Sequence, residues 1–300
     1  MKVLVWRRGG IGDTVLLLPA LRALRRRFPR SHITVVGNPG PLSLVIPPAD
    51  EVRSADEALW AVLFSSASPT PKLRSYLREF DLAVVYTEDE FLIRGLEKAG
   101  VGRVISWPPF PRERVHETEH LLAALTPLGI VDEDPTPRIE PPEDVKEIWE
   151  RLNLGERTLA VHPGSGSPEK NWPPERFAGL ILWAEGELNI SSLLLCGPAD
   201  GEAVEGVVRA LGKCPPMAED LPLREVAGVL RRCSAFVGND SGITHIAAAV
   251  GTPTVALFGP SDPEVWAPRG PRVEVISSNR MDDIPLTAVQ NVLRRILSTK

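Results

Sequence analysis

A chain of 300 residues is long for one domain and sufficient for two domains that each bury a core. Hydrophobic residues make up 43% and charged residues 24%, as in a soluble globular protein, and no apolar run approaches the ~20 residues of a membrane span. The net charge of −5 argues against general nucleic-acid binding. The first residues have the pattern of a strand rather than of a signal peptide, so we expect a cytoplasmic protein.

The three cysteines are Cys196, Cys214 and Cys233. Their number is odd and their spacing is not that of metal ligands, which disfavours a disulfide framework or a zinc ribbon. We expect reduced and buried thiols.

Positive charge is concentrated at the start of the chain. Residues 1–49 contain eight lysines and arginines against one acidic residue, Asp13, which gives this segment a net charge of +7. A solvated helix surface explains such a segment, and a face for an anionic acceptor or an anionic membrane surface is the alternative. Arg7 and Arg8 are the candidate residues for such an acceptor.

The chain begins with the pattern strand, glycine turn, helix. Residues 2–6 form an apolar run, residues 9–12 contain three glycines, and residues 15–28 repeat apolar side chains at helical spacing. Pro19 lies inside this helix and predicts a kink or a broken first turn.

The glycine turn resembles a dinucleotide-binding loop only in part. Gly10 and Gly12 have the required spacing, but Val15 occupies the third glycine position. In addition, no acidic residue lies between Asp13 and Asp50 to bind a ribose. We therefore expect the glycines to bring another ligand, or Asp13, close to the backbone.

Strands and helices alternate along the rest of the chain. Further strands are expected at residues 32–36, 81–86, 102–105, 158–162, 192–196, 235–237 and 254–258. This alternation predicts parallel sheets, in which ligands bind beyond the carboxyl ends of the strands. Asp13 and the acidic run 88–90 fall on that edge, although a solvated loop is the simpler interpretation of the acidic run.

A proline-rich, acidic stretch from 132 to 142 interrupts the alternation and is the clearest linker in the chain. It places a domain boundary near residue 140, followed by a helix at 143–152. Asp132 and Asp134 in this stretch match a metal-binding D-x-D pattern, but solvent exposure is the simpler explanation.

Residues 116–120 read His-Glu-Thr-Glu-His, the H-E-x-x-H pattern of zinc proteases. On a helix this spacing places His116 and His120 on one face. The segment reads as the last helix of the first domain and has no obvious third ligand, so we predict no metal here.

The second half contains a Gly/Ser-rich loop after its first strand. The loop includes Ser165 and Gly166 and ends at Lys170. A P-loop would need Gly before and Ser or Thr after the lysine, whereas Glu169 and Asn171 flank it here, which disfavours an ATPase. The loop predicts phosphate binding, with an exposed surface loop as the alternative.

The stretch 238–245, Gly-Asn-Asp-Ser-Gly-Ile-Thr-His, lies between an apolar strand and an Ala-rich helix. Asp240 and Ser241 are helix N-cap residue types, and Gly242 allows a ligand to approach the backbone. The free amides of the first helical turn form a ready anion site, which predicts bound phosphate. An ordinary strand-to-helix turn is the alternative.

Together these stretches resemble the lipopolysaccharide heptosyltransferase family, glycosyltransferase family 9. The resemblance covers nearly the whole chain and rests on three motifs: Gly12-Asp13 with 18–21, 162–165 with 170–173, and 238–242 with His245 and 258–263. It implies an α/β protein of GT-B architecture, with two facing Rossmann-like domains that have parallel sheets and a cleft between them.

The resemblance also implies which part of the chain binds each substrate. Residues 1–140 would bind the acceptor and residues 141–280 the nucleotide sugar. The amphipathic helix within 281–300 would pack back on the first domain.

Residue roles follow from the matched motifs. Asp13 resembles the catalytic base, and Lys170 resembles the residue that neutralises the donor diphosphate. Gly12, Asp240 and His245 would support these groups. The residues implied at the donor diphosphate are Ser165, Gly166, Lys170, Ser241, Gly242 and Ile243.

The expected activity is an inverting, metal-independent transfer of heptose from ADP-heptose to an anionic lipid-linked acceptor of the lipopolysaccharide inner core. No cofactor is implied, and the enzyme would contact the inner face of the cytoplasmic membrane at most peripherally. The acidity of residues 88–90 departs from what a phosphorylated acceptor predicts. The alternatives are a sugar-nucleotide epimerase of the same architecture and a nucleotide-sugar-binding protein without turnover.

Overall fold

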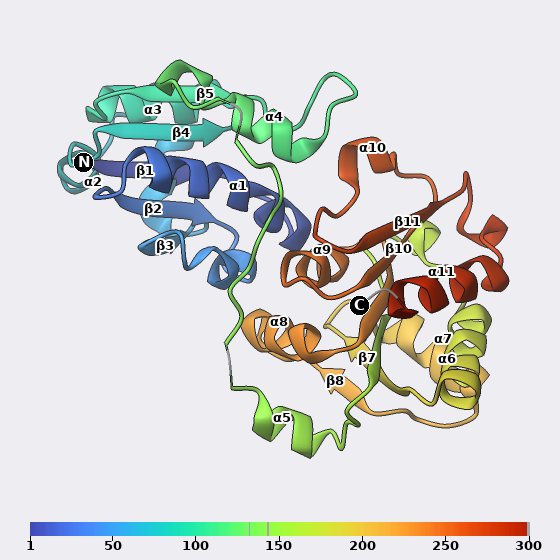
Figure 1. Cartoon of the computed structure of the whole chain (residues 1–300). Helices are drawn as coiled ribbons and strands as arrows, with labels where there is room; N and C mark the ends of the chain where they lie inside the picture. The colour runs from blue at the N-terminus through green and yellow to red at the C-terminus, as the bar shows by residue number, and fades with distance from the viewer. Residues whose placement is uncertain (132, 143, 299–300) are drawn as a thin grey trace. The chain divides into compact units, whose positions relative to one another are not determined.

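The computed structural model describes residues 1–131, 133–142 and 144–298. The chain divides into two compact units, unit 1 with residues 1–136 and unit 2 with residues 137–300, and each unit is built on one parallel β-sheet (Figure 1). Asp132 of the D-x-D pattern and Glu143, the expected start of a helix, lie outside the described residues. The domain boundary drawn at residue 140 stays a prediction.

Unit 1 contains a sheet with the strand order β3-β2-β1-β4-β5, in which all neighbours are parallel. Its described strands are β1 (Lys2–Trp6), β2 (His32–Gly37), β3 (Glu51–Ser54), β4 (Leu82–Tyr86) and β5 (Val104–Trp107). Its described helices are α1 (Ile11–Arg27), α2 (Pro71–Leu77), α3 (Glu90–Ala99) and α4 (Glu117–Ala123), with the 3-10 helices η1 (Pro41–Val45), η2 (Ala58–Phe64) and η3 (Thr126–Leu128).

The core of unit 1 covers both faces of this sheet. Leu4 and Trp6 of β1 point to one face, where they pack with apolar side chains of η2, α2 and α3. Val3 and Val5 point to the other face because side chains alternate along a strand, and both are fully buried. Strands buried on both faces are continuous apolar runs, which is why β1 and β4 are recognisable in the sequence.

Helix α1 continues through Pro19, where the sequence predicted a kink or a broken first turn. Pro19 removes one backbone hydrogen bond from the helix, at a cost of about 3 kcal/mol in an exposed helix. The helix buries most of its residues from Val15 to Leu24, which offsets that loss. Burial against the rest of unit 1 therefore decides the local structure here.

Unit 2 contains a six-stranded parallel sheet with the order β11-β10-β9-β6-β7-β8. Its described strands are β6 (Thr158–His162), β7 (Ser191–Cys196), β8 (Met217–Glu219), β9 (Ala235–Asn239), β10 (Thr254–Phe258) and β11 (Val273–Ser277). Its described helices are α5 (Lys146–Arg151), α6 (Pro174–Leu188), α7 (Gly201–Leu211), α8 (Leu223–Arg232), α9 (Gly242–Ala249), α10 (Pro263–Trp266) and α11 (Leu286–Ser298), with η4 (Pro168–Lys170) and η5 (Met281–Asp283).

Two helical layers cover the sheet of unit 2 (Figure 1). Helices α6, α7 and α11 pack with β6, β9 and β10 in one core cluster, while α8 and α9 contact each other on the opposite face. The apolar face of α11, with Val289, Leu293 and Ile296, is buried in that cluster within unit 2. The sequence led us to expect packing of this helix on the first domain, and that expectation stays a prediction.

Within the described residues, no helix combines the length and the apolar composition that crossing a membrane requires.

Candidate active site

Asp13 lies just beyond the carboxyl end of β1, in the first turn of α1. Its Oδ2 accepts a hydrogen bond of 2.7 Å from the backbone N–H of Gly10, the residue that precedes the helix. This bond satisfies an amide that has no partner within the helix and fixes the carboxylate at the helix start. The side chain is 23% exposed, so one edge of the carboxylate remains accessible.

Gly9 has a steric reason to be glycine. A Cβ atom at this position would lie 2.5 Å from the Cβ of Asp13, whereas a Cβ at Gly10 would meet Asp13 only at 3.7 Å. The glycine turn therefore brings Asp13 close to the backbone, as the sequence predicted. Loop and helix pack at this point without room for a methyl group.

Gly9→Ala should therefore displace Asp13, whereas Gly10→Ala should be tolerated. We expect Gly9→Ala to lower the free energy of unfolding by about 1–3 kcal/mol, as overpacking does. Thermal unfolding of the two variants measures this effect. Equal behaviour of the two variants would contradict the steric account.

Arg7 follows β1 directly, and its side chain is only 2% exposed. Its Nη2 donates to Asp13 Oδ1 at 3.1 Å and to Glu117 Oε1 at 2.6 Å, and its Nη1 donates to the carbonyl of Pro109 at 2.8 Å. The guanidinium also lies 5.8 Å from the ring centroids of Tyr86 and Phe110. Arg7 was a candidate acceptor contact, and its observed contacts are with these groups of unit 1.

Glu117 is the acidic partner that sequence reasoning missed. It is the first residue of α4, and its side chain is 0% exposed. Burial raises the pKa of Glu117 to about 7; Arg7 acts in the opposite direction, and Asp13 adds to the increase. A signal was present in the sequence, because Glu117 lies one helical turn before the apolar Leu121 and thus on the buried face.

The histidines of the H-E-T-E-H pattern have separate structural contacts. His116 precedes α4 and its Nδ1 accepts a hydrogen bond from the backbone N–H of Thr118. His120 lies inside the helix and its Nε2 donates to the carbonyl of Pro108 at 2.9 Å. Among the described residues, no group of three or more His, Cys, Asp or Glu is arranged to hold a metal ion.

Carboxylates of unit 1 compensate much of the positive charge of residues 1–49. Arg8 pairs with Asp56 at 2.7 Å, outside the contacts that surround Asp13. Further ion pairs of this segment join Lys2 to Glu79, Arg7 to Asp13 and Glu117, Arg25 to Asp50, and Arg26 to Glu133. The basic residues within 1–49 therefore do not form one uniform face of uncompensated positive charge.

The acidic run 88–90 has structural contacts as well. Asp89 caps α3, where its Oδ1 accepts from the backbone N–H groups of Phe91 and Leu92. Glu90 pairs with Arg94 one turn along the helix, and Glu88 pairs with Arg112. A solvated loop with a helix cap accounts for this run.

Lys170 and Asp240 meet at the carboxyl edge of the sheet in unit 2. Lys170 ends η4, and its Nζ donates to Asp240 Oδ2 at 2.8 Å. Asp240 follows β9 and is 11% exposed, whereas Lys170 is 32% exposed. Asp240 thus holds the ammonium group at the helix start of α9, and one side of that group remains accessible.

Asn239 connects the Gly/Ser-rich loop to the end of β9. This fully buried residue donates from Nδ2 to the carbonyl of Pro163 at 2.7 Å and accepts at Oδ1 from the backbone N–H of Trp172. Ser165 Oγ lies 2.7 Å from both the carbonyl of Ser167 and Asn171 Oδ1. The loop that carries Lys170 is therefore held to the strand at both of its ends.

The predicted anion site at 241–243 lies at the start of α9. Ser241 precedes the helix in an extended conformation, and Gly242 and Ile243 form its first turn. N–H groups of a first turn have no acceptor within the helix, so they are available to an anion. Gly166 has open space beside its Cα, and His245 is buried inside α9.

His162 and Asp200 support this helix start and were not among the predicted site residues. His162 Nδ1 lies 3.2 Å from Ser241 Oγ, and its Nε2 lies 3.0 Å from Asp200 Oδ2. Burial opposes ionisation of Asp200, but its hydrogen bond to His162 and the N–H of Gly197 outweigh it, so the pKa of Asp200 lies below its usual value. These hydrogen bonds connect the end of β6 with the segments that follow β7 and β9.

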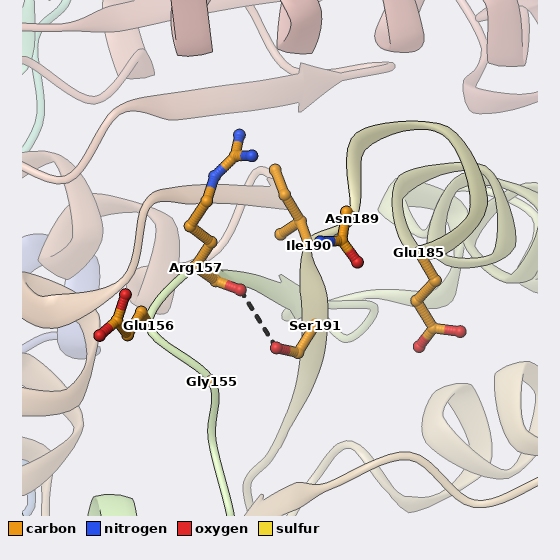
Figure 2. A pocket seen from close by; sticks show the side chains of 7 residues that line it. All are labelled: Gly155, Glu156, Arg157, Glu185, Asn189, Ile190 and Ser191. Carbon is orange, nitrogen blue, oxygen red and sulfur yellow. Dashed lines mark hydrogen bonds between the residues drawn. The ribbon is translucent and has the colours of Figure 1, made fainter.

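A cavity of about 540 Å³ lies elsewhere in unit 2 (Figure 2). It is formed where the chain enters β6 and β7, at the amino edge of the sheet, opposite to the edge that carries Lys170. Its lining residues are Gly155, Glu156, Arg157, Glu185, Asn189, Ile190 and Ser191. None of the predicted site residues lines it.

The cysteines of unit 2 are free thiols. Cys233 is buried, and burial raises its pKa to about 12. Cys214 is exposed and Cys196 is half-buried, which corrects the expectation that all three thiols are buried. Cys214 lies in the segment between α7 and β8 rather than within an element that has an apolar face.

The structure therefore groups the predicted residues into two sets. Asp13 and Arg7 form one set in unit 1, to which Glu117 is added. Lys170, Asp240 and Ser241 form the other at the edge of unit 2.

The two parallel-sheet α/β units, each with polar groups at the carboxyl ends of its strands, have the fold of GT-B glycosyltransferases. The solved structure of the Escherichia coli ADP-heptose lipopolysaccharide heptosyltransferase II is similar, with a TM-score of 0.79 at 22% identity over 99% of each chain. Residues 108–293 match the family model of glycosyltransferase family 9 (heptosyltransferase). The chain belongs to this family and is a glycosyltransferase.

Curated relatives match different lengths of the chain. The lipooligosaccharide heptosyltransferase 2 of Haemophilus influenzae is 35% identical over 133 residues, which span 41% of this chain and 37% of that protein. The lipopolysaccharide heptosyltransferase 3 of E. coli K12 is 23% identical over 288 residues, which span 86% of this chain and 82% of that protein.

Proposed function

We propose that the protein transfers heptose from ADP-heptose to an anionic inner-core lipopolysaccharide acceptor, with inversion at the anomeric carbon. The observation that carries this proposal is Asp13, a carboxylate fixed by Gly10 and Arg7 yet partly accessible. The names of the similar proteins support the donor and the acceptor class.

In the proposed reaction, Asp13 takes the proton of the acceptor hydroxyl while the hydroxyl oxygen attacks the anomeric carbon of the donor. The bond from that carbon to the phosphate oxygen breaks, and its electron pair leaves with ADP. Attack from the face opposite to the departing ADP inverts the configuration.

Negative charge grows on the diphosphate as it leaves, and stabilising this charge is the task proposed for unit 2. Lys170 supplies a positive charge, and the first-turn amides of Gly242 and Ile243 add the positive end of the α9 dipole. Ser165 and Gly166 complete the loop side. These groups support a reaction that needs neither a metal nor a cofactor.

A thermal-shift panel of nucleoside diphosphates and their sugars tests the donor. A ligand that binds only the folded state stabilises it by about 2.7 kcal/mol at a concentration 100-fold above its Kd. We expect ADP and ADP-heptose to raise the unfolding temperature and UDP and NAD to leave it unchanged. Stabilisation by UDP or NAD without ADP would overturn the proposed donor class.

A further inference from the structure

Two carboxylates share one nitrogen of a buried guanidinium in unit 1. Nη2 of Arg7 donates to Glu117 at 2.6 Å and to Asp13 at 3.1 Å, so the shorter bond goes to the buried partner. Asp13 is 23% exposed and Glu117 is 0% exposed. Of these two carboxylates, only Asp13 has an edge that a substrate can reach.

The buried pair of Arg7 and Glu117 is incompletely satisfied. Nε of Arg7 and Oε2 of Glu117 are both buried and have no hydrogen-bond partner among the described residues. Buried polar atoms without partners destabilise a fold, and hydrophobic replacements of buried ion pairs are often neutral or stabilising. Stability alone therefore gives little reason for a glutamate at this position.

We propose that Glu117 is a positioning residue for Asp13. Glu117 holds the guanidinium of Arg7 in place and offsets part of the positive charge of Arg7 beside Asp13. This inference rests on the proposed function, in which Asp13 is the base. An arginine beside an aspartate lowers the basicity of that aspartate. A second carboxylate on the same nitrogen shares the positive charge of Arg7, so that charge is not directed at Asp13 alone.

The charge on Glu117 depends on pH in the neutral range. Its raised pKa, about 7, reflects burial first, with Arg7 opposing and Asp13 adding to the increase. The other titratable neighbours are Tyr86 on β4, which is neutral because burial raises its pKa, and His120, whose pKa burial lowers. As the pH rises through about 7, Glu117 ionises, and its negative charge offsets part of the positive charge of Arg7.

The test compares the pH profile of transfer for the wild type, Glu117→Gln and the control Glu119→Gln, which changes an exposed carboxylate on the same helix. The wild type and the control should show a rate that rises as the pH increases through about 7. Glu117→Gln should lack this rise and have a kcat roughly tenfold lower at high pH, with KM little changed. A rise that persists in Glu117→Gln would overturn the inference.

A second measurement does not depend on turnover. Because the folded-state pKa of Glu117 lies above its unfolded value, the stability that this group contributes at low pH is lost as the pH rises through about 7. As the pH increases from about 5 to about 8, the thermal unfolding midpoint of the wild type should therefore decrease relative to that of Glu117→Gln. A constant difference between the two midpoints would contradict the proposed ionisation.

Glu117→Asp keeps an ionisable carboxyl and should retain the pH-dependent rise in rate. This variant replaces Glu117→Gln in the test if Glu117→Gln does not fold.

Asp13→Asn separates this inference from the proposed function. If Asp13→Asn abolishes transfer and Glu117→Gln behaves as the wild type, only the role of Glu117 is wrong. If Asp13→Asn transfers normally, the base itself is wrong.

Discussion

Asp13→Asn should slow heptose transfer by about 10²- to 10⁴-fold, the range that a general base contributes. Asparagine has nearly the same shape and still offers an oxygen to the N–H of Gly10, so the glycine turn should keep its structure. It cannot take up the proton of the acceptor hydroxyl. Initial rates at saturating donor and acceptor measure the loss, and binding of ADP should remain close to that of the wild type.

Glu97→Gln is the matched control for this experiment, because it neutralises an exposed carboxylate of unit 1 on α3. It should transfer at the wild-type rate. An Asp13→Asn variant as active as this control would show that another group takes the proton.

Lys170→Met should reduce kcat by about 10²- to 10³-fold and weaken ADP binding, because it removes a positive charge proposed to stabilise the leaving diphosphate. Methionine keeps much of the aliphatic length of lysine. The change also leaves Asp240 without its ion-pair partner, and this carboxylate is only 11% exposed. Removing one member of a partly buried pair destabilises a protein by itself.

The double variant Lys170→Met/Asp240→Asn separates the two effects. It removes the unpaired carboxylate, so its unfolding temperature should return toward that of the wild type while transfer stays slow. Lys213→Met is the control, because Lys213 is an exposed lysine of unit 2 that also pairs with a carboxylate, that of Glu185. Recovery of transfer in the double variant would contradict a role of Lys170 at the diphosphate.

The central strands were predictable from the sequence, and three edge strands were not. β1, β4, β6, β9 and β10 are apolar runs because helices cover both faces of their sheets. β3, β8 and β11 lie at sheet edges, where β3 has only partly buried side chains and β8 has three residues. A short edge strand has no apolar run that would distinguish it from a loop.

In the candidate site, short stretches of sequence predicted where the residues lie, but not which distant residues contact one another. Gly9 to Asp13, the loop ending at Lys170 and the stretch 238–245 each follow a recognisable strand, so their place at the carboxyl edges was predictable. The ion pair of Lys170 and Asp240 joins residues 70 positions apart, and that of Arg7 and Glu117 joins residues 110 apart. Only the folded sheet order brings such residues together.

Incubation of the purified protein with ADP-heptose and an inner-core lipopolysaccharide acceptor tests the proposed function most directly. NMR of the product gives the anomeric configuration of the transferred sugar, and chelation of divalent ions tests the proposed metal independence. We predict acceptor-dependent release of ADP, an inverted anomeric centre and a rate unaffected by the chelator. Conversion of ADP-heptose without any acceptor, a retained configuration, or binding without transfer would contradict the account.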